Sequence, residues 1–150
     1  MHVVPMKANS SNSIEYFRPR RRIDITKKPL DIDPHITFNF DGRPFSSRYN
    51  SFYHESRPLE AAKDIFFSNL FIKSFEGQTD FSVIGELGFG TGLNFALACH
   101  YWKKRNDCNT KLHYVAIEPY PLESHQVDRF LSGFSVLDTE RRELVSGYPK

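Results

Sequence analysis

The architecture of this chain is set by one segment, Phe81-Ser82-Val83-Ile84-Gly85-Glu86-Leu87-Gly88-Phe89-Gly90-Thr91-Gly92-Leu93-Asn94-Phe95. Its first part is an apolar run typical of a buried parallel strand, and three glycines follow at alternate positions. An amphipathic segment then continues to Tyr101. This order predicts a strand, a tight loop and a helix. Glycines let a ligand approach the backbone, and a helix start offers unpaired N–H groups, so the segment is typical of a nucleotide-type cofactor site.

A second strand is predicted from Leu112 to Ile117, and it ends in Glu118. A strand, a helix and a strand in this order form a βαβ unit, which implies parallel pairing and a right-handed crossover. Further helices are predicted over residues 122–134 and 138–146. We therefore expect residues 80–150 to be the first βα units of a Rossmann-like α/β domain. Such sheets usually hold about six strands, so we expect the domain to be incomplete, with an exposed sheet edge.

Residues 1–34 are expected to form a flexible basic leader. An Asn- and Ser-rich stretch there precedes Arg18-Pro19-Arg20-Arg21-Arg22. These arginines could meet a phosphate backbone, but a solvated leader is the favoured interpretation.

Residues 35–79 are expected to form an extension made of a β-hairpin and a helix. Alternating apolar residues and Asp41-Gly42, a favoured type I′ turn, indicate the hairpin, and Pro44 predicts that the returning strand lies on an edge. The helix is expected to begin after Ser56 and to run to about Phe75. Aromatic residues near the hairpin either line a ligand or seal the hairpin onto the domain, the favoured interpretation: Tyr49, Phe52 and Tyr53.

The composition is that of one globular domain. The chain has 150 residues, 39% of them hydrophobic, and a net charge of +2, which permits nucleic-acid binding without arguing for it. Cys99 and Cys108 lack metal-ligand spacing and are expected to be reduced thiols, so no metal site is predicted. The sequence contains no apolar run of membrane-spanning length and no signal peptide. These features predict a soluble, cytoplasmic protein with no membrane partner.

The spacing of the glycines separates two classes of cofactor. A dinucleotide site favours G-x-G-x-x-G, but here the third glycine comes one residue early, and Glu86 stands two positions before Gly88. S-adenosylmethionine carries an α-amino group and a sulfonium, and a carboxylate at the strand end can meet the amino group. Glu118 is placed to accept both ribose hydroxyls. The pattern therefore favours a methyl donor over a dinucleotide, while a purely structural glycine turn stays open.

Gly85-Glu86-Leu87-Gly88-Phe89-Gly90-Thr91-Gly92-Leu93-Asn94-Phe95 resembles the signature of the MnmC-type class I methyltransferases, which act on the aminomethyl group of tRNA wobble uridine. Asp41 to Ser46 is similar to the hairpin of that family, and Glu118-Pro119-Tyr120-Pro121-Leu122 is similar to its E-K-Y-P-L segment. The resemblance covers roughly residues 36–150. It implies a Rossmann-like methyltransferase fold, S-adenosylmethionine as cofactor and tRNA as partner. The cofactor-binding residues that it implies are Glu86, Gly88, Phe89, Gly90, Thr91, Gly92, Asn94 and Glu118.

The chain departs from the family pattern at three places. The loop Asn50-Ser51-Phe52-Tyr53-His54-Glu55 differs from the family's aspartate-containing loop, and Pro119 replaces a basic residue. The family's catalytic segment, Asp-Gly-Phe-Ala-Pro-x-x-Asn-Pro, has no counterpart, so no catalytic residue is assigned. We therefore expect an N-terminal part of such an enzyme, with the remainder in a missing C-terminal half or a second chain.

Three functional hypotheses follow from these residues. The first is a tRNA-modifying methyltransferase, with Arg18–Arg22 and Lys103–Arg105 as candidate phosphate contacts. The second is an inactive remnant or interaction module that keeps the fold. The third, disfavoured by the early third glycine, is a dinucleotide-dependent oxidoreductase domain. The flavin-dependent domain found downstream in two-domain relatives has no residues here, so flavin binding is not predicted.

Overall fold

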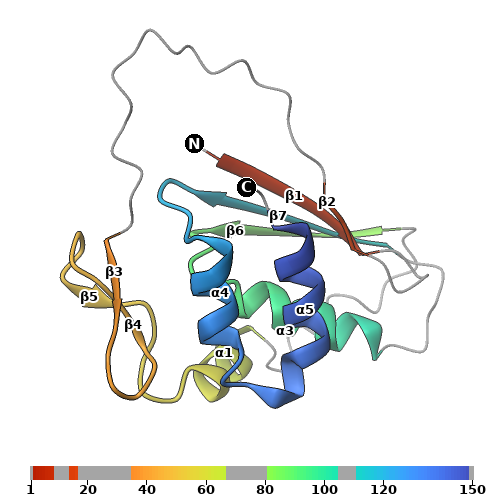
Figure 1. Ribbon diagram of the computed structural model, residues 1–150. Helices are drawn as coiled ribbons and strands as arrows, with labels where there is room; N and C mark the ends of the chain where they lie inside the picture. The colour runs from red at the N-terminus through yellow and green to blue at the C-terminus, as the bar shows by residue number, and fades with distance from the viewer. Residues whose placement is uncertain (1, 9–13, 17–34, 67–80, 105–110, 149–150) are drawn as a thin grey trace, which may run out of the picture.

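The computed structural model describes residues 2–8, 14–16, 35–66, 81–104 and 111–148. They form a four-stranded sheet of order β2-β1-β7-β6, a three-stranded sheet of order β3-β4-β5, and a group of helices (Figure 1). The strands are β1 His2–Ala8, β2 Ile14–Tyr16, β3 Ile36–Phe38, β4 Pro44–Ser46, β5 Ser51–Phe52, β6 Phe81–Leu87 and β7 Lys111–Glu118. The helices are α1 Pro58–Phe66, α3 Leu93–Lys103, α4 Ser124–Leu131, the 3₁₀ turn η1 Ser135–Leu137 and α5 Asp138–Gly147.

The predicted βαβ unit is present. β6 and β7 pair in parallel, with Ile84 opposite Tyr114 and Glu86 opposite Ala116, and α3 connects them. α3 is buried on nearly every side, because it lies against the sheet, α1 and α5. The mixed α/β structure with its parallel pair is compatible with part of a Rossmann-like fold.

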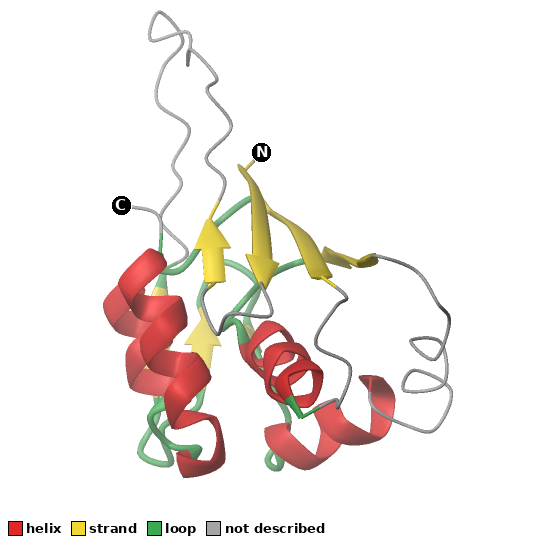
Figure 2. Cartoon of the chain, turned by 90° about the vertical axis from the view of Figure 1, so that its right-hand side faces the viewer, coloured by secondary structure: helices red, strands yellow, loops and turns green. Residues whose placement is uncertain are grey.

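The expectation that β6 is a buried strand is wrong for one of its faces. Val83 is 58% exposed and Leu87 89% exposed, whereas Ile84 packs against the core. β6 is the last strand of its sheet and pairs only with β7 among the described strands. Figure 2 shows the described helices gathered on one side of the four-stranded sheet, which leaves Val83 and Leu87 of β6 without cover from those helices.

The expectation of a flexible leader is wrong for its two described parts. β1 pairs antiparallel with β7, from His2 opposite Glu118 to Ala8 opposite Leu112, and β2 pairs antiparallel with β1. A pairing across so much of the chain leaves no local pattern in the sequence, which explains the missed strand. The basic run Arg18–Arg22 lies outside the described residues.

The hairpin of the extension is confirmed, but its turn differs from the expectation. Gly42 has a φ of +79° and its N–H donates to the Asn39 carbonyl, while Asp41 is not among the described non-glycine residues with positive φ. A type I′ turn needs positive φ at both central residues, so this wider turn, with one left-handed glycine, is of another kind. Pro44 does not lie on an edge strand either, since β4 pairs with both β3 and β5. It is the first residue of β4, a place where proline is tolerated inside a sheet.

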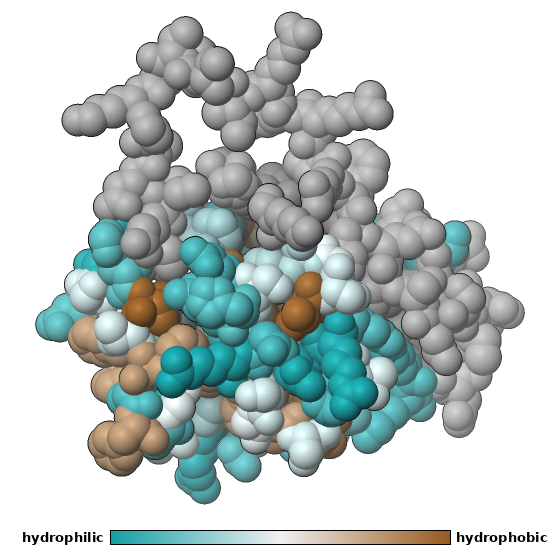
Figure 3. Space-filling view, in the orientation of Figure 1, coloured by the Kyte–Doolittle hydropathy of each residue, from teal (hydrophilic) through white to brown (hydrophobic). Residues whose placement is uncertain are grey.

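The small sheet presents apolar side chains to solvent. Phe40 at the hairpin turn is fully exposed, and Phe52 is partly exposed. In Figure 3 pale brown surface gathers at the lower left, over the small sheet, while the surface over α4 and α5 is mainly hydrophilic. The Arg43 guanidinium lies over the Phe52 ring at 4.4 Å and covers part of it.

The helices begin close to where the sequence predicts. α1 starts at Pro58, as expected after Ser56, and the region from residue 67 to the predicted helix end lies outside the described residues. α4 starts later than expected because Glu123 forms a capping box with Gln126. Leu122 and Val127, on either side of this cap, are both buried. No helix in the described part of the chain is long and apolar enough to cross a membrane.

Candidate functional site at the glycine loop

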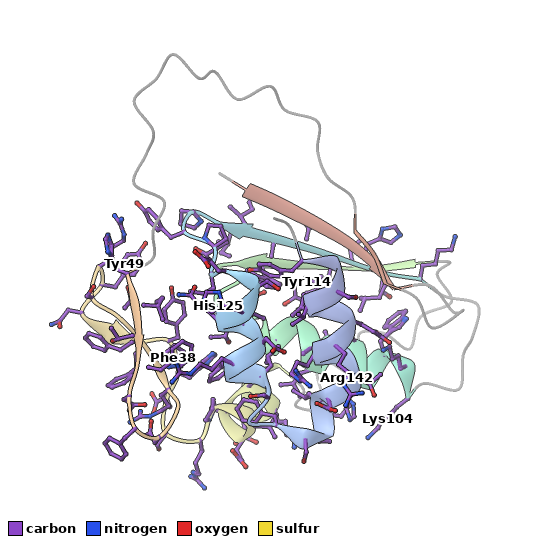
Figure 4. All side chains as sticks on the ribbon, in the orientation of Figure 1. Phe38, Tyr49, Lys104, Tyr114, His125 and Arg142 are labelled. Atoms are coloured by element: carbon purple, nitrogen blue, oxygen red, sulfur yellow. The ribbon has the colours of Figure 1, made fainter. Side chains whose placement is uncertain are left out.

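Glu86 stands near the end of β6 and is held by two side chains. Asn94, on the first turn of α3, donates an amide N–H to Glu86 Oε1 at 2.7 Å, and the Tyr114 hydroxyl donates to Oε2 at 2.7 Å. Figure 4 shows Tyr114 on the helical side of the sheet. The strand, the following helix and the neighbouring strand therefore each place one group at this carboxyl.

The surroundings of Glu86 raise its pKa above the ordinary value of a glutamate side chain. Burial raises the pKa of Glu86, and the Glu118 carboxylate raises it further, while the bonds from Asn94 and Tyr114 oppose the shift. Burial and the Glu86 carboxylate also raise the pKa of the Tyr114 hydroxyl, which keeps it a donor. A cationic ligand beside Glu86 would stabilise the ionised carboxylate and oppose this rise in pKa. The charge interaction is stronger at this partly buried position than at an exposed acid.

Glu118, the last residue of β7, is buried and its two oxygens accept from backbone. The Gly90 N–H donates to Oε2 at 3.0 Å, and the Tyr120 N–H donates to Oε1 at 2.9 Å. An ionised carboxylate has about four acceptor positions, so two remain for the hydroxyls of a ligand. Glu118 therefore fixes the glycine loop and keeps some acceptor capacity.

The glycine loop needs its glycines for backbone conformation. Gly88, Gly90 and Gly92 have φ values of +88°, +52° and +75°, in the left-handed region that side chains rarely allow. The Gly88 N–H donates to the Ile117 carbonyl at 2.8 Å, which joins the loop to the end of β7. The loop thus crosses over the carboxyl ends of two parallel strands, where ligands bind in open α/β sheets.

The predicted site residues divide into two groups by burial. Phe89 is buried against Phe95 and Tyr148, with ring centroids 6.0 and 6.2 Å away. Thr91 is only 1% exposed, and Gly92 packs against Leu144. The side chains of Phe89 and Thr91 point inward, and Gly92 leaves no room for a side chain, so these three residues fix the loop. The residues that reach the surface of the site are Glu86, Gly88, Gly90 and Asn94.

The hairpin extension reaches the loop as well. The Tyr53 ring lies 3.3 Å from where a Cβ on Gly90 would stand, and Nε2 of His54 lies 2.6 Å from Thr91 Oγ1. Burial and the Glu118 carboxylate raise the pKa of Tyr53 to about 12. Nearby, the Tyr49 and Tyr120 rings meet edge to face with centroids 6.0 Å apart. Tyr49 and Tyr53 therefore seal the extension onto the domain beside the site, as favoured from sequence, whereas Phe52 packs on Phe45 within the small sheet.

Sequence reasoning missed Tyr114 and His54. The alternation of β7 places Tyr114 on the same buried face as Glu118, but its contact with Glu86 depends on the register between the two strands. His54 lies in an irregular loop, and nothing in its local pattern indicates the contact with Thr91. Of the candidate phosphate contacts, Lys103 is already paired with Glu143 at 2.6 Å, and Arg105 lies outside the described residues.

The charges at the loop limit what it can bind. Two carboxylates, Glu86 and Glu118, flank it, and the Gly88 and Gly90 N–H groups are already donated within the protein. A pyrophosphate would meet negative charge and few free donors, whereas a ligand with an ammonium group and hydroxyls finds suitable partners. Within the described ranges, no group of three or more His, Cys, Asp and Glu side chains could hold a metal ion.

The fold and the site define a mixed α/β protein, compatible with part of a Rossmann-like fold, with a glycine loop between two parallel strands that carry Glu86 and Glu118 at their ends. Comparison with known proteins narrows this class. No protein-family model matches the chain. It is similar to proteins named tRNA 5-methylaminomethyl-2-thiouridine biosynthesis bifunctional protein MnmC, and its resemblance to them is confirmed.

The extent of the match is consistent among these relatives. The protein of Caulobacter vibrioides is 32% identical over 116 residues, covering 76% of this chain and 20% of its own length. The protein of Pseudomonas fluorescens is 32% identical over 121 residues, and that of Magnetococcus marinus is 28% identical over 115 residues. The chain is thus MnmC-like over about three quarters of its length, and the match spans about a fifth of the length of these relatives.

Proposed function

We propose that this chain binds S-adenosylmethionine and forms the donor side of a methyltransferase that acts on the aminomethyl group of tRNA wobble uridine. The observation that carries the proposal is the pair of carboxylates, Glu86 and Glu118, at the ends of neighbouring parallel strands on either side of the glycine loop. The names of the relatives refer to biosynthesis of a modified tRNA uridine, and they support a tRNA uridine as the acceptor of the methyl group.

The groups of the site match the donor one by one. Glu86 is placed for the α-amino group of the methionine part, and its bonds from Asn94 and Tyr114 hold the carboxylate in one orientation. Glu118 has acceptor positions left for the ribose hydroxyls. Gly88 is exposed, so a ligand can approach the backbone there.

A dinucleotide fits the same site poorly. Its pyrophosphate needs free N–H groups and a helix N-terminus without nearby negative charge. Here the Gly90 N–H is donated to Glu118, and the Tyr53 ring covers the Cα of this glycine. The oxidoreductase hypothesis therefore remains disfavoured by geometry as well as by glycine spacing.

When bound, the donor supplies a methyl group made electrophilic by its sulfonium. The neutral amine of the acceptor forms the new N–C bond, the S–C bond breaks with its electron pair going to sulfur, and the amine loses a proton to a base. The chain's contribution is to orient the donor through Glu86, Asn94 and Glu118. No residue of this chain is assigned as the base.

Titration calorimetry of the full chain with S-adenosylmethionine tests the proposal. We expect saturable one-site binding, with NAD and FAD as ligands that do not saturate. S-adenosylhomocysteine keeps the α-amino group and the ribose, so it should bind as well. Binding of NAD or FAD in place of S-adenosylmethionine would overturn the proposal.

A second measurement addresses the acceptor. Methyl transfer from labelled S-adenosylmethionine to tRNA that carries 5-aminomethyl-2-thiouridine, compared with tRNA that is already methylated there, tests the substrate class. Donor binding without turnover supports a donor half that needs further residues for catalysis. Cooperative unfolding without any donor binding would favour the interaction-module hypothesis instead.

A further inference from the structure

Two consecutive residues of the hairpin extension contact two consecutive residues of the glycine loop. Tyr53 lies over Gly90, and His54 lies within hydrogen-bond distance of the Thr91 hydroxyl. Tyr53 is itself fixed, since its N–H donates to the Pro44 carbonyl at 3.0 Å. The small sheet therefore carries a contact that reaches the part of the loop between its second and third glycines.

His54 is held in one orientation by its surroundings. Its ring stacks on the Phe130 ring of α4 with centroids 4.8 Å apart and an interplanar angle of 9°. Burial lowers the pKa of His54 to about 4, so the imidazole is neutral at neutral pH. A neutral imidazole offers one donor and one acceptor nitrogen, and a hydroxyl can complement either of them. The His54–Thr91 contact is therefore satisfied in both tautomers.

A contact that orders the glycine loop before the ligand arrives would strengthen ligand binding. The three glycines of the loop have positive φ, and glycine has more conformational freedom to lose than any other residue. A loop that must be ordered by its ligand binds that ligand more weakly than one ordered beforehand. Thr91 is the residue of the loop that carries a buried hydroxyl, so a bond to it fixes the backbone on both sides.

We propose that His54 is a positioning residue of the methyl-donor site, which holds the Thr91 hydroxyl and so keeps the glycine loop in its binding conformation before the donor arrives. This inference rests on the proposed function. His54 acts through the loop and does not need to touch the donor. It lies in the segment where the chain departs from the pattern of the resembling family, so the contact is a feature of this sequence.

Four variants of the full chain separate this role from simple packing. His54→Phe keeps a ring against Phe130 and removes the polar nitrogen, and Thr91→Val keeps the shape of the side chain and removes the hydroxyl. His54→Gln is the conservative variant, because its amide can reach the place of Nε2. His125→Phe makes the same chemical change at an exposed position of α4 and serves as the matched control.

Two readouts are measured for each variant: the Kd for S-adenosylmethionine and the hydrogen-exchange rates of the loop amides without ligand. We expect His54→Phe and Thr91→Val each to weaken binding about fivefold to tenfold, as loss of one hydrogen bond predicts. We expect faster exchange at the Gly90 and Gly92 amides in both. The double variant should be no weaker than either single one, and His54→Gln and His125→Phe should stay near wild type.

The outcomes are distinct from those of the proposed function. If wild type does not bind S-adenosylmethionine, the proposed function fails, and the exchange rates still decide whether His54 holds the loop. If His54→Phe and Thr91→Val leave both the loop exchange and the Kd unchanged, the positioning role is overturned. A loss of affinity and faster loop exchange in His54→Gln, with His54→Phe near wild type, would also overturn it, since ring packing against Phe130 alone would then suffice.

Discussion

The Gly90 N–H donates a 3.0 Å hydrogen bond to Oε2 of Glu118, so the glycine loop is tied to the end of the neighbouring strand. The other oxygen of the same carboxylate accepts the Tyr120 N–H. The Glu118 side chain thus satisfies two backbone donors beside the ligand site. It orders both the glycine loop that follows β6 and the segment that follows β7. Its contributions to stability and to ligand binding are therefore coupled.

Glu118→Gln is expected to reduce both stability and donor affinity. A glutamine has a single acceptor oxygen, so it leaves either the Gly90 or the Tyr120 N–H without its partner, at a cost of about 1–3 kcal/mol. Chemical denaturation and calorimetry with S-adenosylmethionine measure the two effects. Glu55→Gln, at an exposed loop position, is the control and should change neither. Wild-type stability in Glu118→Gln would mean that the two backbone bonds contribute little.

Tyr114→Phe is expected to shift the pH dependence of donor binding. The hydroxyl donates to Glu86 and opposes the rise of its pKa, so its removal raises the pKa of Glu86 further. Since a cationic donor needs the ionised carboxylate, binding should strengthen as pH rises through this pKa, and the rise should occur at higher pH in the variant. Calorimetric Kd values over a series of pH values check it. Coincident profiles for the two proteins would contradict this role of Tyr114.

Gly92→Ala is expected to destabilise the fold strongly. A Cβ at this position would lie 2.9 Å from a Leu144 methyl and 3.1 Å from the Phe89 ring, at a φ of +75°. The backbone strain alone costs about 1–2 kcal/mol, and the overpacking adds to it. Gly85→Ala is the matched control, because a Cβ there meets nothing within 4 Å and its φ is not positive. Thermal unfolding of the two variants should therefore differ by many degrees.

Two leucines close together in sequence should respond very differently to truncation. Leu87 is 89% exposed on the open face of β6, and Leu93 is 1% exposed at the start of α3. Leu93→Ala is expected to cost about 2–5 kcal/mol through a buried cavity, and Leu87→Ala about 0.5 kcal/mol or less. Denaturant titration gives both values. A large loss in Leu87→Ala would show that this face is covered in solution.

Acidification is expected to weaken the fold through His54. Its pKa is about 4 in the folded chain against 6.5 as its ordinary value, so the unfolded chain takes up the proton first as pH falls. The associated stability is fully present above pH 6.5, declines between 6.5 and about 4, and has fallen by about 2 kcal/mol at pH 5. The difference in unfolding free energy between wild type and His54→Gln, followed over this range, isolates the effect. A pH-independent difference would contradict it.

Local signals explain which parts of the fold the sequence predicts. The β6–α3–β7 unit follows from an apolar strand, alternate glycines and a helical pattern that are contiguous along the chain. β1 could not be predicted, because its pairing depends on β7, far along the chain. The exposed face of β6 was missed for a related reason: burial depends on which neighbours a strand has, and an apolar run alone does not specify them.

The residues of the candidate site also divide into those that local sequence patterns predict and those whose placement depends on the folded backbone. Glu86 and Asn94 were predicted from their places beside the glycines, and Glu118 from its place at the end of the second strand. The structure brings Asn94 to Glu86 and Glu118 to Gly90. Phe89 and Thr91 were placed in the site by the same motif, but their side chains point into the core. Whether a loop residue faces a ligand or the interior depends on the backbone dihedrals of the loop, and the spacing of residues does not give them.

The antiparallel pairing of β1 with β7 also constrains the order of folding. His2 meets Glu118, so closing this pair means bringing together positions separated by most of the chain, and the entropy of that closure must be overcome before any of its hydrogen bonds form. The β6–α3–β7 unit has much shorter connections and should be able to form first. β1 and β2 are then expected to add late to an existing sheet edge, and in the native protein the amides of β1 should exchange before those of β7.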